Sequence, residues 1–202
     1  MMFLFTLFIS AAWALPFHLD IHAVALESSP WTEQTLKPEF EDARQVFSQC
    51  GLEISLVGFH KTEGLDKLTK YKNGLPSSLD SIAGATHTIP RPVVYLVNEF
   101  ADAEPNPFAR APFIDLLEPY PEAINNTVWY PFHVLSEGYK KIRQASPYSP
   151  LAHELTHVLT LWGDHNNDPE PNLLTIYKRR NNRLTDEMCK RIVAHPLVRA
   201  TR

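Results

Sequence analysis

The stretch 149–165 reads S-P-L-A-H-E-L-T-H-V-L-T-L-W-G-D-H, and the interpretation of the rest of the chain depends on it. It predicts a helix, because Ser149 is a favourable N-cap and Pro150 suits the first helical position. Residues four apart lie on one face of a helix, so His153 and His157 can present their imidazoles to one point. This H-E-x-x-H order indicates a metal site on the predicted helix.

Two histidines do not complete such a site, because zinc in hydrolases usually takes three protein ligands and keeps a fourth position for water. Gly163 is a typical helix stop, and His165 follows two residues later as a candidate third ligand. Glu154 comes directly after His153, where its carboxylate can lie beside a water molecule on the metal. The alternative is a chance H-E-x-x-H in a buried helix with ordinary histidines.

The composition predicts an exported globular protein. The chain has 202 residues, which favours one domain, and its net charge of −4 gives no support for nucleic-acid binding. Residues 1–14 are apolar, uncharged and too short to span a bilayer, and Ala12-Trp13-Ala14 fits a signal-peptidase site. We therefore expect a signal peptide cleaved after Ala14. The alternative is a buried N-terminal strand or helix.

The mature chain, 15–202, is expected to be a single monomeric domain. Because no other stretch predicts a membrane span, we expect it in the periplasm or outside the cell. Export changes the interpretation of Cys50 and Cys189, which are the two cysteines of the chain. In an oxidising compartment an isolated pair favours a disulfide, although two buried thiols are the alternative. Asn125 begins a glycosylation sequon, which matters only in a source that glycosylates.

Hydrophobic periodicity predicts a mixture of strands and helices. Residues 17–26 alternate apolar and polar side chains, an amphipathic helix is expected from about Lys37 to Cys50, and 52–56 alternate again. Strand, helix and strand in this order predict a β-α-β unit with parallel strands. Further strands are expected at 93–97 and 126–130, within a proline-rich region of long loops.

A last helix is predicted near the C-terminus. Thr185 is its expected N-cap, the acidic Asp186 and Glu187 suit a helix N-terminus, and Pro196 ends it.

This layout resembles the catalytic domain of metzincin-type zinc metallopeptidases, in motif over 153–174 and in element order over most of 15–202. The resemblance implies an α+β fold with a small, mixed, twisted sheet. It also implies that His153, His157 and His165 bind one Zn²⁺ ion and that Glu154 is the catalytic base. The implied activity is that of a secreted zinc-dependent endopeptidase, which acts on peptide or protein substrates.

Two features depart from the family pattern. In the family spacing H-E-x-x-H-x-x-G-x-x-H the third histidine comes six positions after the second, whereas His165 comes eight positions after His157. With the stop at Gly163, the helix is expected to be longer and the return to the metal tighter. Asn172-Leu173-Leu174 stands where the family has a methionine-containing turn beneath the metal, and Leu174 for methionine is a volume-conserving change.

Several alternatives stay open. The third ligand is a glutamate in a second zincin group, which makes Glu187 a candidate, and Asp164 and Asp168 are others. Tyr177 is either a hydrogen-bond donor to the transition state or a core tyrosine.

Peptide substrate is expected to dock by β-augmentation at a rim within 90–148. The alternative function is a non-catalytic zinc-binding or interaction protein that keeps the fold.

Overall fold

The computed structural model describes residues 15–27, 29–62, 84–97, 125–137, 141, 148–163, 165, 170–175 and 181–201. The predicted signal peptide therefore lies outside the described residues, as do Asp164, Asp168 and Tyr177. Among the described residues, no helix combines the length and apolar character needed to cross a membrane.

The sheet contains four parallel strands and one short antiparallel partner. The parallel strands lie in the order β2-β1-β3-β4, and β5 pairs with the start of β1. Their bounds are β1 Phe17–Leu26, β2 Leu52–Thr62, β3 Val93–Val97, β4 Thr127–Pro131 and β5 Arg199–Ala200. A 3-10 turn, η3 Phe132–Leu135, follows β4. This confirms the predicted mixed sheet and its parallel β-α-β unit.

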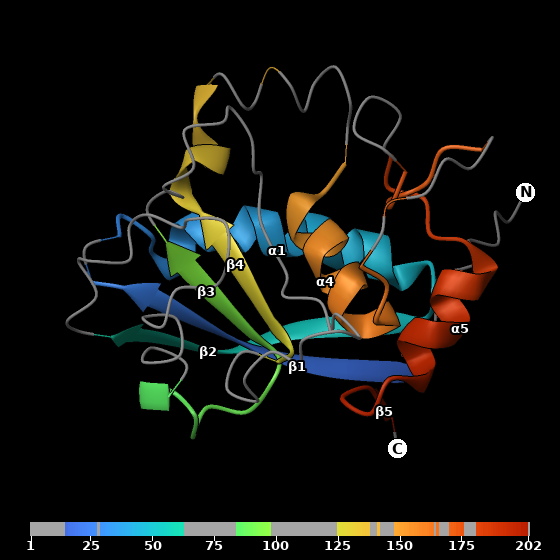
Figure 1. The fold of residues 1–202 in the computed structure, drawn as a ribbon, viewed down its shortest axis with the longest axis horizontal. Coiled ribbons are helices and arrows are strands. Elements are labelled where there is room, and N and C mark those ends of the chain that lie inside the picture. The colour runs from blue at the N-terminus through green and yellow to red at the C-terminus, as the bar shows by residue number, and fades with distance from the viewer. Residues whose placement is uncertain are drawn as a thin grey trace, which may run out of the picture.

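Helices α1 (Glu33–Ser48) and α4 (Pro150–Thr160) lie side by side on one face of the sheet, as Figure 1 shows, and α5 (Asp186–Ala194) packs against α4. The alternation of β1 explains this layer, because Leu19, Ile21 and Ala23 point into the same core as both helices. The opposite face of the sheet carries a smaller apolar cluster and, nearer the start of β1, polar side chains.

Helix α1 begins earlier than the sequence predicted. The expected start near Lys37 is wrong, because Thr32 is the N-cap and Pro38 lies inside the helix. Thr32 and Thr35 form a reciprocal capping box, in which each backbone N–H donates to the other residue's hydroxyl at 2.9 and 3.1 Å. These bonds satisfy amides that a helix start otherwise leaves unpaired. The capping box therefore outweighs the proline as a start signal.

The predicted disulfide is present and joins the end of α1 to α5. Cys50 and Cys189 are bonded, with Cα atoms 5.0 Å apart and a sequence separation of 139 residues. Beside the disulfide, the Gln49 side chain donates to the Asn182 carbonyl at 2.7 Å and accepts from the Leu184 amide at 3.2 Å. The C-terminal segment is thus fixed to the end of α1 next to the start of α4.

Candidate metal centre

The start of α4 follows the sequence prediction. Ser149 is the N-cap, its hydroxyl accepts a hydrogen bond from the Ala152 amide at 3.2 Å, and Pro150 opens the helix. The Ser149 amide in turn donates to the Asn182 side-chain oxygen at 2.7 Å. Every residue of α4 is buried, so the polar side chains on it face the protein interior. Fixed at this end, the helix can hold its histidines in defined positions.

The end of α4 differs from the prediction. The helix stops at Thr160 rather than near Gly163, because Leu161 adopts a left-handed conformation with φ of 57°. This conformation is uncommon for a residue with a side chain and is usually supplied by glycine. Leu161 remains 58% exposed, so the turn has no buried side chain to accommodate. The expected extra helical turn is therefore absent, and the chain reverses early enough for His165 to return.

The imidazoles of His153, His157 and His165 converge on one point. The Nε2 atom of His153 lies 3.2 Å from Nε2 of His157 and 3.0 Å from Nε2 of His165. The candidate ligand atoms of the three residues all lie within 4.8 Å of one another. Tetrahedral zinc with Zn–N bonds of about 2.0–2.1 Å separates its ligand nitrogens by about 3.3 Å. The cluster therefore has the dimensions of a three-histidine metal site.

Backbone carbonyls fix the tautomers of the two helical histidines. Nδ1 of His153 lies 2.7 Å from the Leu173 carbonyl oxygen, and Nδ1 of His157 lies 2.5 Å from that of Trp162. A carbonyl oxygen only accepts, so each Nδ1 must carry the proton and donate it. Each neutral ring then has its lone pair on Nε2, directed at the shared point. This second-shell hydrogen bonding is typical of metal-binding histidines.

A buried turn supplies the carbonyl that orients His153. The Asn172 side-chain oxygen accepts from the Leu174 amide at 2.9 Å, and the Asn172 amide donates to the Thr175 hydroxyl at 2.8 Å. The Leu173 amide donates to the Arg183 carbonyl at 2.9 Å. This is the segment that the family resemblance placed beneath the metal, and its Leu173 carbonyl contacts the His153 ring. The contributions of the Leu173 and Trp162 carbonyls were missed, because backbone groups leave no signal in residue identity.

The remaining predicted site residues have different outcomes. Glu154 follows His153 in α4 and is 7% exposed, so it is a buried acid adjacent in sequence to one member of the cluster. Glu187 instead forms an ion pair with Arg191 one helical turn away, with Oε1 and Nε 3.1 Å apart. Among the described residues, the group that could hold a metal contains no carboxylate. The other proposed ligands, Asp164 and Asp168, and Tyr177 are outside the described residues.

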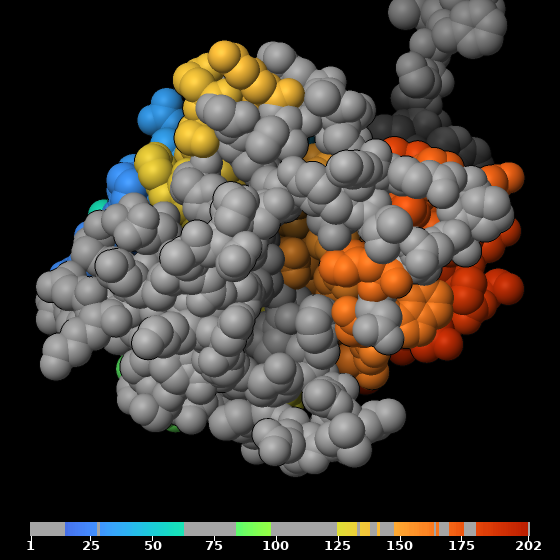
Figure 2. All heavy atoms as spheres, turned by 45° about the horizontal axis from the view of Figure 1, so that its top comes forward, coloured from blue at the N-terminus to red at the C-terminus, as the bar shows by residue number. Residues whose placement is uncertain are grey.

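The cluster combines two buried histidines with an exposed one. His153 and His157 are 2% and 3% exposed, whereas His165 is exposed. Atoms of the orange segment that contains α4 reach the surface in Figure 2. The Tyr148 ring packs edge-on against the His153 ring, with centroids 6.1 Å apart. Two of the three histidines are thus held by the core, and the third is exposed to solvent.

The sequence matches no protein-family profile and no curated protein. The fold is similar to the crystal structure of metalloproteinase-II from Bacteroides fragilis, with 14% identity and a TM-score of 0.54. That likeness covers 90% of this chain and 53% of the other, so the chain spans about half the length of its structural relative. A chain from a chaperone-substrate complex has 14% identity and a TM-score of 0.44, and the match covers 77% of this chain and 28% of that one. The chain therefore has a metalloproteinase-like fold with three histidines that could hold a metal ion.

Proposed function

We propose that this protein is a secreted zinc-dependent endopeptidase. The observation that carries the proposal is the convergence of three Nε2 atoms, two of them oriented by Nδ1 hydrogen bonds to carbonyl oxygens. An all-imidazole set suits zinc, and three protein ligands leave one position for water and substrate. The metalloproteinase-like fold supports a peptide substrate, and the disulfide supports export.

Glu154 is the residue proposed to move the proton. His153, His157 and His165 would hold the zinc ion, which would lower the pKa of water to about 7 and polarise the scissile carbonyl group. Glu154 accepts the proton of the attacking water and passes it to the leaving amine as the peptide bond breaks. Its burial on α4, directly after His153, supports a role inside the site. The rim within 90–148, where an extended substrate is expected to dock, lies largely outside the described residues.

The two α4 histidines position the metal for this chemistry. Their Nδ1 protons are held by carbonyl oxygens, so neither ring has to rotate or exchange a proton when the site loads. His165, the exposed ligand, follows the reversal at Leu161 and closes the set from the solvent side. The site is thus rigid on the core side and open on the side where a peptide arrives.

The experiment compares zinc content and peptide cleavage in the wild type and in Glu154→Gln. Purified protein should carry about one zinc ion per chain and cleave members of a broad peptide library. Glu154→Gln should keep its zinc, because all three imidazoles remain, and lose about 10²–10⁴-fold in cleavage rate. Glu41→Gln, an exposed glutamate on α1, is the matched control and should retain both properties.

Two results would contradict the proposal. An unchanged cleavage rate in Glu154→Gln would exclude this residue as the base. Zinc-loaded wild type that cleaves no member of the library would favour the alternative, a zinc-binding or interaction protein that retains the fold.

A further inference from the structure

The face of the sheet opposite α1 and α4 carries a second pair of converging histidines. His22 on β1 and His60 on β2 have ring centroids 5.5 Å apart and nearly parallel planes, at 29°. Nδ1 of His22 lies 3.3 Å from Nε2 of His60, within hydrogen-bond distance, with the donor set by the tautomers of the two rings. Both side chains are at least partly open to solvent. Neither residue belongs to the candidate metal centre, so their convergence needs its own explanation.

A β-bulge in β2 brings the two rings to the same face. Before the bulge, Leu52 and Ile54 point into the main core, so even-numbered residues face inward. The register then shifts: Ile21 pairs with Leu56, but His22 pairs with Gly58. The extra residue, Val57, is 49% exposed. One inserted residue inverts the alternation of a strand, so His60 points outward beside His22 rather than into the core.

Glycine at position 58 makes the space between the rings. A Cβ atom built on Gly58 would lie 2.7 Å from Nδ1 of His22 and 2.7 Å from Nε2 of His60. Real Cβ atoms essentially never approach this closely, so any other residue would push the two nitrogens apart. Gly58 does not have a positive φ, so the backbone conformation does not require glycine there. The missing side chain matters instead for the room it leaves beside two ligand-type nitrogens.

We propose that His22, His60 and the space over Gly58 form a second metal site, one that takes a borderline divalent cation such as Zn²⁺, Cu²⁺ or Ni²⁺. The 3.3 Å between the two nitrogens matches the separation of about 3.3 Å that adjacent tetrahedral ligands require. Imidazole nitrogen is a preferred ligand for these three ions. A two-histidine site leaves the other coordination positions to water and binds more weakly than the three-histidine centre.

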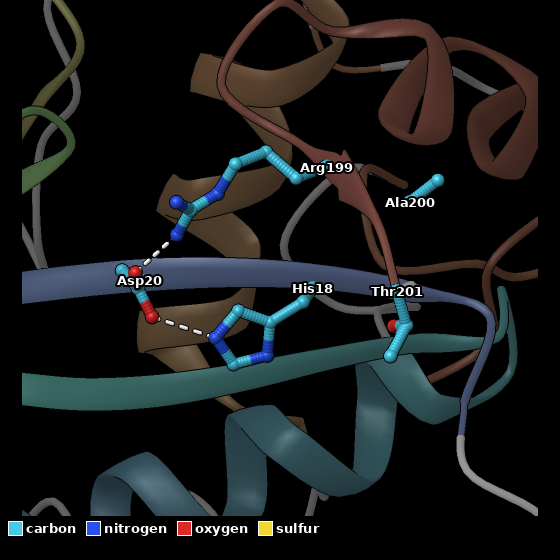
Figure 3. Close-up of a pocket in the computed structure, with 5 residues that line it drawn as sticks. All are labelled: His18, Asp20, Arg199, Ala200 and Thr201. Carbon is cyan, nitrogen blue, oxygen red and sulfur yellow. Dashed lines mark hydrogen bonds and ion pairs between the residues drawn. The ribbon is translucent and has the colours of Figure 1, made fainter.

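The neighbouring carboxylate is already engaged. Asp20, two residues before His22 on β1, accepts from His18 through one oxygen at 2.6 Å and from Arg199 through the other. Figure 3 shows Asp20 between these two side chains at a pocket lined by His18, Asp20, Arg199, Ala200 and Thr201. The two histidines are therefore the protein ligands of the proposed site, and Asp20 contributes a nearby negative charge.

The test measures metal stoichiometry and affinity by titrating chelator-treated full-length protein with Zn²⁺, and separately with Ni²⁺, in a calorimeter. His60→Ala removes a ligand. Gly58→Ala keeps both histidines but pushes their ring nitrogens apart. Both rings are at least partly exposed, so they can rotate outward without disturbing the core. Each variant should lose about one equivalent of bound metal relative to wild type, or weaken that equivalent at least about tenfold, because even losing a second-shell partner costs about 10–100-fold.

His87→Ala is the matched control, because His87 is an exposed histidine whose Nδ1 bonds the Gly84 carbonyl. It should leave the stoichiometry unchanged, and circular dichroism should show that all variants keep the wild-type fold. An equivalent that persists in both His60→Ala and Gly58→Ala, or that is lost in His87→Ala, would overturn the proposal. Because the readout is a difference from wild type, the result does not depend on whether the α4 cluster binds metal.

Discussion

Nδ1 of His153 lies 2.7 Å from the carbonyl oxygen of Leu173, so a turn twenty residues further along the chain orients a histidine in the middle of α4. The acceptor is a backbone atom, so its position depends on the hydrogen bonds that hold the turn. The Asn172 side chain supplies one of these bonds, to the Leu174 amide, and it is fully buried.

Asn172→Ala should therefore weaken metal binding without removing a ligand. Losing a second-shell partner of a metal ligand costs about 10–100-fold in affinity. The unpaired Leu174 amide should also lower the free energy of unfolding by about 1–3 kcal/mol. Zinc affinity measured by competition with a chelator, under conditions where the variant is fully folded, separates the two effects.

Leu174→Met is the control for this turn, because it conserves volume and leaves the Asn172 hydrogen bond intact. It should cost less than about 1.5 kcal/mol of stability and leave the zinc affinity near the wild-type value. Equal affinity in Asn172→Ala and wild type would show that the turn does not orient His153.

The second prediction concerns the third ligand. Because the Nε2 atoms of His165 and His153 lie 3.0 Å apart, His165→Ala should lose most of the bound zinc. Glu187→Ala should keep its zinc, since the Glu187 carboxylate pairs with Arg191 on an exposed face of α5. Metal content after dialysis against zinc-free buffer gives the comparison, with Asp164→Ala included because that aspartate was a sequence-based alternative. Full zinc in His165→Ala together with loss in either acidic variant would assign the third ligand to the acid.

The third prediction concerns the disulfide between Cys50 and Cys189. It closes a loop with a sequence separation of 139 residues, for which the chain-entropy model gives about 4–5 kcal/mol, and removing native disulfides typically costs about 2–5 kcal/mol. Replacing both cysteines with alanine should lower the free energy of unfolding, measured in guanidinium, by an amount in that range. Reductant should destabilise the wild type but not the variant. Two alkylatable thiols in protein taken from its native compartment would show that the bond does not form there.

Local signals in the sequence predicted much of this structure. The alternation in 17–26, the apolar run at 93–97 and the Ser149 and Thr185 caps each depend on neighbouring residues, and each is found where it was expected. The H-E-x-x-H pattern also fixed the relation of His153 to His157, because helical geometry alone puts residues four apart on one face.

The misplaced features depend on contacts that sequence spacing does not show. Glycine at 163 predicted the end of α4, but the helix ends before Leu161, which adopts the left-handed conformation with its side chain exposed. The bulge at Val57 has no composition signal, so the strand predicted at 52–56 ended where β2 in fact continues to Thr62. The carbonyls that orient His153 and His157 were also missed, because every residue has a backbone carbonyl and residue identity therefore gives no signal.

The last prediction concerns stability in mild acid. His195 is 7% exposed at the end of α5, and its Nδ1 accepts a hydrogen bond from the Leu197 amide at 3.3 Å. Burial lowers the pKa of His195 below its ordinary value of 6.5. Burial and then the neighbouring His60 lower the pKa of His22 in the same direction. Between the unfolded and folded pKa values the unfolded chain binds more protons, so stability should fall as the pH drops from 7 through 6.5 and below.

Asp20 contributes in a separate, more acidic range. Burial alone would raise the pKa of its carboxyl group, but the hydrogen bonds from His18 and Arg199 outweigh burial and leave the pKa below 3.8. Its stabilising contribution is present above the unfolded pKa and is lost only as the pH falls through the folded value. The loss of this contribution therefore lies below the mild-acid range in which His195 and His22 act.

His195→Asn isolates one of these two groups. The asparagine side-chain oxygen can accept a hydrogen bond from the backbone amide two residues further along the chain, and it does not titrate in this range. Thermal unfolding of metal-free protein, followed by circular dichroism between about pH 7.5 and pH 5, spans the pKa of an unfolded histidine. The Tm of the wild type should fall towards acid, and that of His195→Asn should fall less. Removing the metal beforehand matters because protonation of the α4 histidines would release zinc and lower the Tm by another route. Parallel Tm curves for the two proteins would mean that protonation of His195 does not contribute to the acid sensitivity.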